Sequence, residues 1–199
     1  MASLSIRALL ASYLALALFC SVSAHAGILQ VGFAELPITP SVLDEWVDVN
    51  DDAQFDPDID TWTDTNGNGV FDPVWIAGFQ KGRAAQGVKD DLMAVAVVID
   101  DGDQRLAVVA VDTIGLMRKF VLDVRQSVNK KWELDHLMIH ATHNHEGPDT
   151  QGLWGPSLFE SGINDEYMHD LKESILAVVE TAISKLEPTD MSIARIATD

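Results

Sequence analysis

Two continuous apolar runs separated by a short acidic turn constrain the fold of this 199-residue chain more than any other feature. Residues 93–99 and 106–111 are almost wholly apolar, and the intervening Asp-Asp-Gly-Asp at 100–103 has the composition of a turn. Apolar runs of this length between turn residues are typical of strands that are buried on both faces. The pattern therefore predicts a β-hairpin in the core of the protein.

Helical periodicity follows the hairpin, and a strand pattern then returns. Apolar residues recur at helical spacing from 117 to 128, and residues 137–141 form a further apolar run. A second helix is predicted from Asn164, which is a good N-cap, to Leu186, and Pro188 lies beyond its end. This alternation predicts an α/β fold with a layered mixed sheet and flanking helices.

Two further strands are predicted near the ends of the chain, at residues 28–34 and 191–197. A strand that close to Asp199 would normally lead into more sheet, so the pattern favours a truncated part of a larger domain. Residues 27–199 are long enough to bury one ordinary core, and we predict a single folded unit for them.

The first 26 residues predict a secretory signal peptide. Arg7 supplies a positive start, residues 8–22 are almost wholly apolar, and Ala24-His25-Ala26 fits the small-x-small rule for cleavage. The apolar run is short for a membrane span, and no later segment is long enough to cross a bilayer. We therefore expect a secreted or periplasmic protein without a transmembrane segment after cleavage.

Cleavage removes Cys20, the single cysteine, so any metal must be bound by His, Asp, Glu, Tyr or backbone oxygen. The formal net charge of −18 becomes −19 without Arg7, because residues 1–26 contain no acidic residue. Such an acidic chain disfavours nucleic acid as a partner and is typical of a well-solvated surface.

Residues at about 44–75 differ in character from the rest. From Asp44 to Asp72 acidic residues are dense, Asn, Gly and Pro are frequent, and no apolar period is sustained. We identify no internal repeat, and the composition predicts a long surface loop inserted into the domain. The tryptophans in or near such loops either pin them to the body or grip an acyl chain; they are Trp46, Trp62, Trp75 and Trp154.

This insertion contains a candidate calcium loop. Its oxygen-bearing side chains fall at positions 1, 3, 5 and 9 of the calcium-loop spacing, with a backbone carbonyl at position 7; the residues are Asp64, Asn66, Asn68, Asp72 and, for the carbonyl, Val70. Trp75 stands where an EF-hand has its closing Glu, so Asp56, Asp58 or Asp60 would have to close the site. The alternative is a solvated Asn-Gly turn.

A histidine block follows the strand predicted at 137–141. His143 and His145 are two residues apart, and Gly147-Pro148 then turns the chain. In extended backbone such residues point to the same side, so both imidazoles could reach one metal ion or one substrate. Asp112, directly after the 106–111 run, could orient a ligand histidine or simply end its strand.

Three blocks together resemble the amino-terminal catalytic domain of the neutral/alkaline, non-lysosomal ceramidases. They are Val31-Gly32-Phe33-Ala34 with Ile38-Thr39-Pro40, the hairpin from Ala94 to Asp112, and Ala141-Thr142-His143-Asn144-His145-Glu146-Gly147-Pro148. The family's last block reads A-T-H-T-H-S-G-P, from which this chain departs at Asn144 and Glu146. The resemblance covers most of residues 28–199 apart from the acidic insertion.

The resemblance implies an exported zinc-dependent amidohydrolase that cleaves the amide of ceramide, or of a related N-acyl lipid, into a sphingoid base and a fatty acid. It implies that His143 is a zinc ligand and that His145 is catalytic, through a hydrogen bond to the substrate or the oxyanion. The family's other ligands, a His, a Glu and a Tyr, come from later in the chain. This portion alone is therefore expected to be inactive, and any membrane contact would be peripheral.

Two alternatives remain open at this point. A metallo-β-lactamase-like hydrolase has a T-H-x-H-x-D-H block that resembles Thr142-His143-Asn144-His145, but Gly147 and Pro148 stand where that class needs Asp and His. The other alternative is a non-enzymatic extracellular protein that calcium stabilises, in which the histidines are structural.

Overall fold

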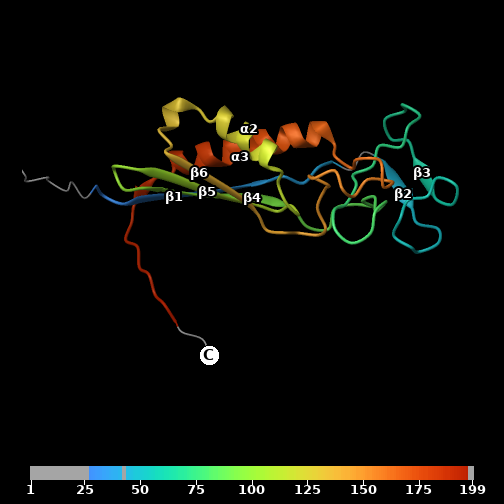
Figure 1. Cartoon of the computed structure of the whole chain (residues 1–199), viewed down its shortest axis with the longest axis horizontal. Coiled ribbons are helices and arrows are strands. Elements are labelled where there is room, and N and C mark those ends of the chain that lie inside the picture. The colour runs from blue at the N-terminus through green and yellow to red at the C-terminus, as the bar shows by residue number, and fades with distance from the viewer. Residues whose placement is uncertain (1–26, 42–43, 197–199) are drawn as a thin grey trace, which may run out of the picture.

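The computed structural model describes residues 27–41 and 44–196, and its centre is a five-stranded mixed sheet (Figure 1). The strand order is β6-β5-β4-β1-β7. The strands are β1 (Gln30–Pro37), β4 (Met93–Asp100), β5 (Arg105–Val111), β6 (His136–Ala141) and β7 (Glu187–Pro188). Neighbouring strands are antiparallel except for β5 and β6, which run parallel. The α/β fold with a mixed sheet is therefore as predicted, and the predicted signal peptide lies outside the described residues.

Both α-helices, α2 (Arg118–Ser127) and α3 (Asp165–Ser184), cover the same face of the sheet, while a short 3-10 helix, η1 (Lys130–Trp132), follows α2 (Figure 1). The predicted N-cap of α3 is confirmed, because the Asn164 side chain accepts a hydrogen bond from the Tyr167 N–H at 3.0 Å. In the described part of the chain, neither helix has the length and apolarity needed to cross a membrane.

The core lies between α3 and the alternate residues of the strands that face it. Ala94, Ala96 and Val98 of β4 are fully buried there, opposite Ile175 and Val178 of α3. Close packing depends on Gly32 of β1, because a Cβ at this position would collide with the Ala182 carbonyl of α3. A glycine in mid-strand is therefore explained by the approach of the helix backbone.

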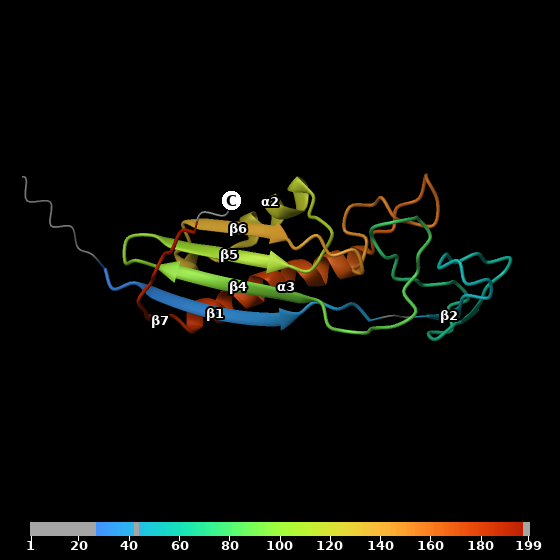
Figure 2. The same cartoon turned by 90° about the horizontal axis from the view of Figure 1, so that it is seen from below.

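The opposite face of the sheet is also apolar, but it is open among the described residues (Figure 2). The side chains of Val95, Val97 and Val108 are partly exposed on this face, and Phe33 and Met138 are about half exposed. The continuous apolar runs of β4 and β5 match these two apolar faces. The prediction that both faces are buried is wrong for the described residues, because only the face toward α3 is fully covered.

The ends of the chain depart from the predicted strands. β1 is shifted to Gln30–Pro37, and its pairing with β4 continues as far as Pro37 opposite Met93. The strand predicted at 191–197 is wrong for its described part, since residues 189–196 form no strand and are exposed. They have no neighbouring strand beyond the two-residue β7, and an unpaired strand is not stable in water.

The acidic insertion is not a structureless loop. It contains β2 (Glu45–Val47) and β3 (Thr61–Thr63), which form a separate antiparallel pair with Trp46 opposite Trp62. Trp46 is buried and donates its indole N–H to the Ala84 carbonyl, so this tryptophan does attach the insertion to the body.

The insertion is an internal repeat, which corrects the expectation from sequence. Residues 44–57 and 60–73 align without a gap, and their shared residues include every aromatic position. The identical pairs are Asp44/Asp60, Trp46/Trp62, Asp48/Asp64, Asn50/Asn66, Phe55/Phe71, Asp56/Asp72 and Pro57/Pro73. The backbone repeats as well, because residues 51 and 53 have positive φ angles, as do their counterparts Gly67 and Gly69.

The two copies exchange hydrogen bonds, and we call residues 44–73 the paired-loop module. Asp44 is fully buried and accepts the backbone N–H groups of Thr65 and Asp72 from the second copy, at 2.9 and 2.8 Å. Asp60, the counterpart of Asp44, accepts the corresponding two N–H groups of the first copy at 2.9 and 2.8 Å. Phe55 and Phe71 stack between the copies with ring centroids 3.9 Å apart. The module thus has an approximate twofold axis.

Candidate functional site

The histidine block lies at the end of the sheet, where its backbone is tied to the segment after β5. The N–H of Thr142 donates to the Val111 carbonyl, and those of His143 and Asn144 both donate to the Thr113 carbonyl, at 3.1 and 3.2 Å. β6 already ends at Ala141. His143 is not extended as predicted, since its φ is +67°. The two bonds to one carbonyl hold the chain in this left-handed turn, which few non-glycine residues adopt.

The turn nevertheless brings the two imidazoles together. The ring centroids of His143 and His145 are 4.8 Å apart, with an edge-to-face angle of 75°. Nδ1 of His143 lies 2.8 Å from the Ile114 carbonyl oxygen, which can only accept, so Nδ1 carries the proton. In the neutral ring Nε2 of His143 then keeps its lone pair. A ring fixed by a backbone carbonyl through one nitrogen is the usual state of a metal-ligating histidine.

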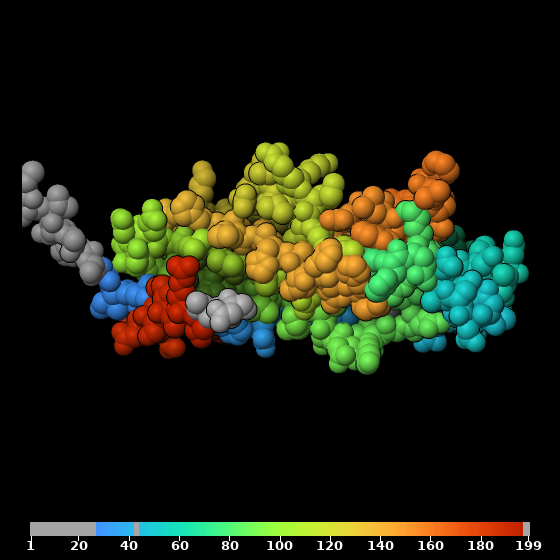
Figure 3. All heavy atoms as spheres, turned by 60° about the horizontal axis from the view of Figure 1, so that its bottom comes forward, coloured from blue at the N-terminus to red at the C-terminus, as the bar shows by residue number. Residues whose placement is uncertain are grey.

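A hairpin of residues 74–85 lies against the block and was not predicted. Its first arm runs antiparallel to residues 147–149, with the Ala77 N–H donating to the Gly147 carbonyl and the Asp149 N–H donating to the Trp75 carbonyl. The tip of the hairpin also contacts the segment that follows residues 147–149, because the Gly82 N–H donates to the Gly155 carbonyl (Figure 3). The sequence signal was weak, a turn with Gly78 and Gly82 and no apolar period.

The hairpin brings an aromatic ring and a cation to the histidine block. The Phe79 ring meets the His145 ring edge to face, with centroids 5.3 Å apart. Nη2 of Arg83 lies 2.7 Å from a carboxylate oxygen of Glu146, and its guanidinium lies over the Phe79 ring. Glu146, at which the chain departs from the ceramidase motif, is therefore an ion-pair partner and not a free charge.

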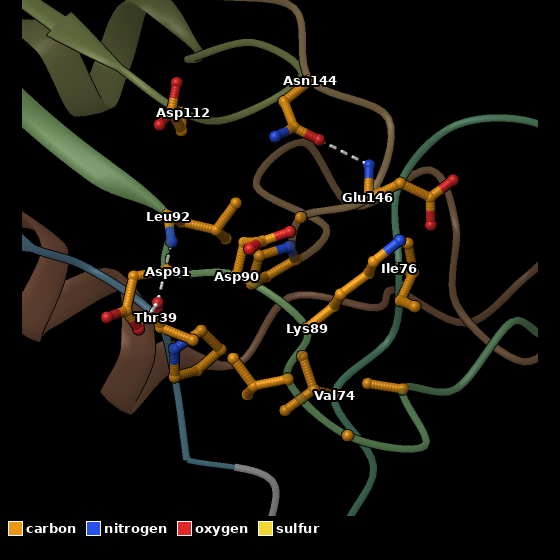
Figure 4. A pocket seen from close by; sticks show the side chains of 16 residues that line it. Thr39, Val74, Ile76, Lys89, Asp90, Asp91, Leu92, Asp112, Asn144 and Glu146 are labelled. Atoms are coloured by element: carbon orange, nitrogen blue, oxygen red, sulfur yellow. Dashed lines mark hydrogen bonds between the residues drawn. The ribbon is translucent and has the colours of Figure 1, made fainter.

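A pocket of about 490 Å³ adjoins the block on the side of Asn144 and Glu146 (Figure 4). Neither His143 nor His145 lines it. Most of the ionisable groups on its wall are acidic, and they are Asp90, Asp91, Asp112 and Glu146, with Lys89 as a cation. Such a wall favours polar or cationic groups over anions.

Among the described residues Asp112 accepts no hydrogen bond from a histidine, so the structure does not bear out the first of its two suggested roles. One carboxylate oxygen accepts the Met93 N–H at 2.9 Å, and the other accepts the Thr142 hydroxyl at 2.9 Å. The carboxylate thus joins the start of β4 to the chain after β6. Its role is to hold the ends of the strands on which the histidine block is mounted.

The candidate calcium loop has its predicted side chains close together. One oxygen of Asp72 accepts the side-chain amides of both Asn66 and Asn68 at 2.7 Å, and Asp64 accepts the N–H groups of residues 67–69. The backbone of Val70 donates to the Asn68 side chain. The acid that accepts a backbone N–H of this loop is Asp44. Asp60 accepts the N–H of Asp56 in the first copy, and Asp58 is exposed. The expected closing acids are therefore wrong.

Within residues 27–41 and 44–196, no three His, Cys, Asp or Glu side chains converge as a metal site. Of the predicted site residues, the structure brings His143 and His145 together. It places Asp64, Asn66, Asn68 and Asp72 close to one another in a separate loop. The donor chemistry fits zinc at one point, the free Nε2 of His143, because neutral imidazole is a common zinc ligand.

Comparison with known proteins identifies the fold. No family model matches the sequence, and no curated protein matches it. Solved structures that are similar in fold include two ceramidases. One is described as a ceramidase complexed with C2, with a TM-score of 0.55 and 20% identity, and the other is neutral ceramidase from Pseudomonas aeruginosa, with a TM-score of 0.56 and 18% identity.

Each comparison covers 80% of this chain and 22% of the other chain. The chain therefore has the fold of a part of the neutral ceramidases, and it spans about a fifth of their length. The fold resemblance predicted from the three sequence blocks is confirmed.

Proposed function

We propose that this chain supplies part of the active site of a zinc-dependent amidohydrolase that cleaves ceramide or a related N-acyl lipid. The observation that carries the proposal is the histidine pair on a ceramidase-like fold. Nδ1 of His143 is fixed on the Ile114 carbonyl, and the ring centroids of His143 and His145 are 4.8 Å apart. In this proposal His143 binds zinc through Nε2. When bound, zinc lowers the pKa of a water molecule to about 7 and so supplies hydroxide for attack on an amide carbonyl.

His145 then has a separate task. Its ring is partly exposed next to that of His143, where it can donate a hydrogen bond to the developing oxyanion or a proton to the leaving amine. One free ligand nitrogen makes one metal bond, whereas a catalytic zinc site takes three protein ligands. We therefore propose that this chain alone binds zinc weakly and is inactive.

Apolar side chains near the histidines support a lipid substrate. Phe79 is 70% exposed beside His145. Leu153, Leu158 and Phe159 are also more than half exposed, in the segment whose backbone bonds to the hairpin tip. Exposed apolar side chains on both the hairpin and this segment suit contact with an acyl chain or the membrane surface. The membrane contact that we propose is peripheral.

The test compares three histidine variants in the protein as its gene encodes it, by zinc content and by hydrolysis of a fluorescent N-acylsphingosine. His143→Ala should lose both zinc and activity. His145→Ala should retain zinc and lose about 10²- to 10³-fold in turnover. His140→Ala is the matched control, since this exposed histidine on β6 belongs to neither role and its variant should behave as wild type. Full zinc occupancy in His143→Ala would contradict the assignment.

We also propose that the paired-loop module binds calcium and that calcium acts on stability. Asp64, Asn66, Asn68 and Asp72 present oxygens within one loop, and the repeat retains oxygen-bearing side chains at the equivalent positions of the first copy. Millimolar calcium should raise the melting temperature of the chain, because a ligand of the native state stabilises it. Asp64→Ala should reduce the rise and Asp58→Ala should keep it. An unchanged melting curve in the wild type would leave the loops as turns.

Export is the last part of the proposal, supported by the pattern of residues 1–26. Amino-terminal sequencing of the protein recovered from the periplasm or medium should begin at Gly27. Recovery of bound calcium without zinc or amidase activity would favour the non-enzymatic alternative.

A further inference from the structure

We propose that the hairpin of residues 74–85 is a positioning element for the His145 imidazole. The inference rests on the proposed function only in its catalytic consequence, because the positioning itself is a statement about the ring. The hairpin is held in register with the histidine block by the backbone bonds of Trp75 and Ala77 to residues 147–149. Its tip is therefore placed on His145 by main-chain geometry.

Gly78, at the tip, forms the surface on which the His145 ring lies. A Cβ at this position would lie 2.7 Å from both Cγ and Nδ1 of the ring, which is too close for real atoms. The φ of Gly78 is +89°, a conformation that L residues rarely adopt. The backbone of Gly78 thus blocks movement of the His145 ring toward the hairpin.

Two aromatic neighbours limit the ring further. Phe79 contacts it edge to face at 5.3 Å, and the His143 ring does so at 4.8 Å. An imidazole that contacts a backbone and two ring edges has few orientations left, so its nitrogens point in fixed directions. This is the preorganisation that a hydrogen-bond donor needs to stabilise a transition state.

Arg83 fastens the hairpin to the block. One guanidinium nitrogen lies within 3.5 Å of the Gly78 carbonyl and 3.4 Å of the His145 carbonyl, and the other pairs with Glu146 at 2.7 Å. The guanidinium also lies over the Phe79 ring, 5.3 Å from its centroid. Arg83 therefore joins Gly78 and Phe79, which both contact the His145 ring, to the backbone of His145 itself.

The decisive variant is Gly78→Ala, with Gly82→Ala as its matched control. Both glycines are in the hairpin and have positive φ angles, +89° and +73°, so both substitutions impose backbone strain. A Cβ on Gly82 would meet nothing closer than 3.9 Å, whereas a Cβ on Gly78 would collide with His145. A difference between the two variants therefore reports the contact with the ring.

The first readout is the NMR signal of the His145 ring in this 199-residue chain. Its Cε1–Hε1 resonance should shift in Gly78→Ala and in Phe79→Ala, and it should stay at the wild-type position in Gly82→Ala. The His140 signal should not move in any variant. An unmoved His145 signal in Gly78→Ala overturns the inference, and Phe79→Ala decides in the same way if Gly78→Ala does not fold.

The second readout is hydrolysis by the protein as its gene encodes it. Gly78→Ala should lower kcat by about 10-fold or more relative to Gly82→Ala with little change in KM, because a small displacement of a reacting group can cost up to about 10²-fold. Phe79→Tyr, which keeps the ring, should restore the activity lost in Phe79→Ala. Absence of hydrolysis in the wild type would refute the proposed function, and the ring signal would still decide the positioning.

Discussion

Removal of Asp44 should unfold the paired-loop module at a much lower denaturant concentration. Asp44 is fully buried and accepts two backbone N–H groups from the other copy of the repeat. A hydrogen bond to a charged group contributes about 1.5–3 kcal/mol, so Asp44→Ala should cost at least about 3 kcal/mol for the two bonds. With a denaturant slope of about 2 kcal/mol/M, the urea midpoint should fall by about 1.5 M.

Tryptophan fluorescence in a urea titration can follow this change, because Trp46 and Trp62 lie in the module and face each other across β2 and β3. Asp58→Ala is the control, since Asp58 lies in the same module, is exposed, and accepts no hydrogen bond among the described residues. Its free energy of unfolding should stay within about 0.5 kcal/mol of that of wild type. An equal midpoint for Asp44→Ala and Asp58→Ala would refute the structural role of Asp44.

A double-mutant cycle tests whether the two copies stabilise each other through the exchanged hydrogen bonds. Asp60 accepts two N–H groups of the first copy as Asp44 does for the second. If each copy orders the other, loss of Asp44 already releases part of what Asp60 stabilises. The double variant Asp44→Ala/Asp60→Ala should then cost less than the sum of the single variants, by about 1 kcal/mol or more. Additive costs would mean two independent loops.

Three further predictions concern the core and the sheet. Tyr167→Phe should raise the free energy of unfolding by about 1 kcal/mol in urea titrations, because the buried Tyr167 hydroxyl has no partner among the described residues; a loss of stability would reveal an unseen partner. The Gly102 N–H and then the Arg105 guanidinium hold the pKa of Asp100 below its ordinary value, so its contribution is present above about pH 4 and is lost as the pH falls through the lower folded pKa. Asp100→Asn should therefore lower the urea midpoint at about pH 6 and much less at about pH 3, and an equal loss at both would contradict this. Gly32→Ala should lower the melting temperature sharply in a calorimetric scan, because its Cβ would collide with the Ala182 carbonyl, and a mild effect would show that α3 can move away.

The parts of the fold that were predictable are those in which burial dictates the sequence. Alternate residues of β4 and β5 are buried against α3, and α3 has an apolar stripe and a side-chain cap at Asn164. The period of each pattern follows from the geometry of a single element. The strand expected at 191–197 failed because a strand also depends on a neighbour, about which its own residues carry no information.

The candidate site shows the same division. The sequence predicted that His143 and His145 lie close together, but the prediction assumed an extended backbone. The structure does not have it, since β6 ends before them and His143 has a positive φ. That φ depends on the Thr113 carbonyl, which lies about 30 residues earlier and cannot be inferred from local spacing. The hairpin of residues 74–85 was missed for a similar reason, because main-chain bonds to residues 147–149 place it and almost any sequence can make them.

The internal repeat was missed although its identities are visible in the sequence. Acidic, Asn and Gly residues fill both copies, so the composition alone predicts a solvated loop. The information lies in the spacing of a few residues, above all in Asp44 and Asp60, whose burial would be costly without hydrogen-bond donors. A buried aspartate is uninformative when it is read singly. When the same aspartate recurs at the same place in a second copy, it points to a shared structural task.

The two departures from the ceramidase motif gain a meaning from the geometry of the block. Asn144 and Glu146 alternate with the histidines, and they line the pocket of about 490 Å³ that His143 and His145 do not line. A change of side chain at either position alters the pocket wall directly. The imidazole pair depends on Thr113, Ile114 and the hairpin, and Arg83 joins Glu146 to that hairpin. Glu146 adds a carboxylate to an already acidic wall, and Arg83 balances its charge from the outside. Through Arg83, Glu146 thus couples the pocket wall to the hairpin beside His145.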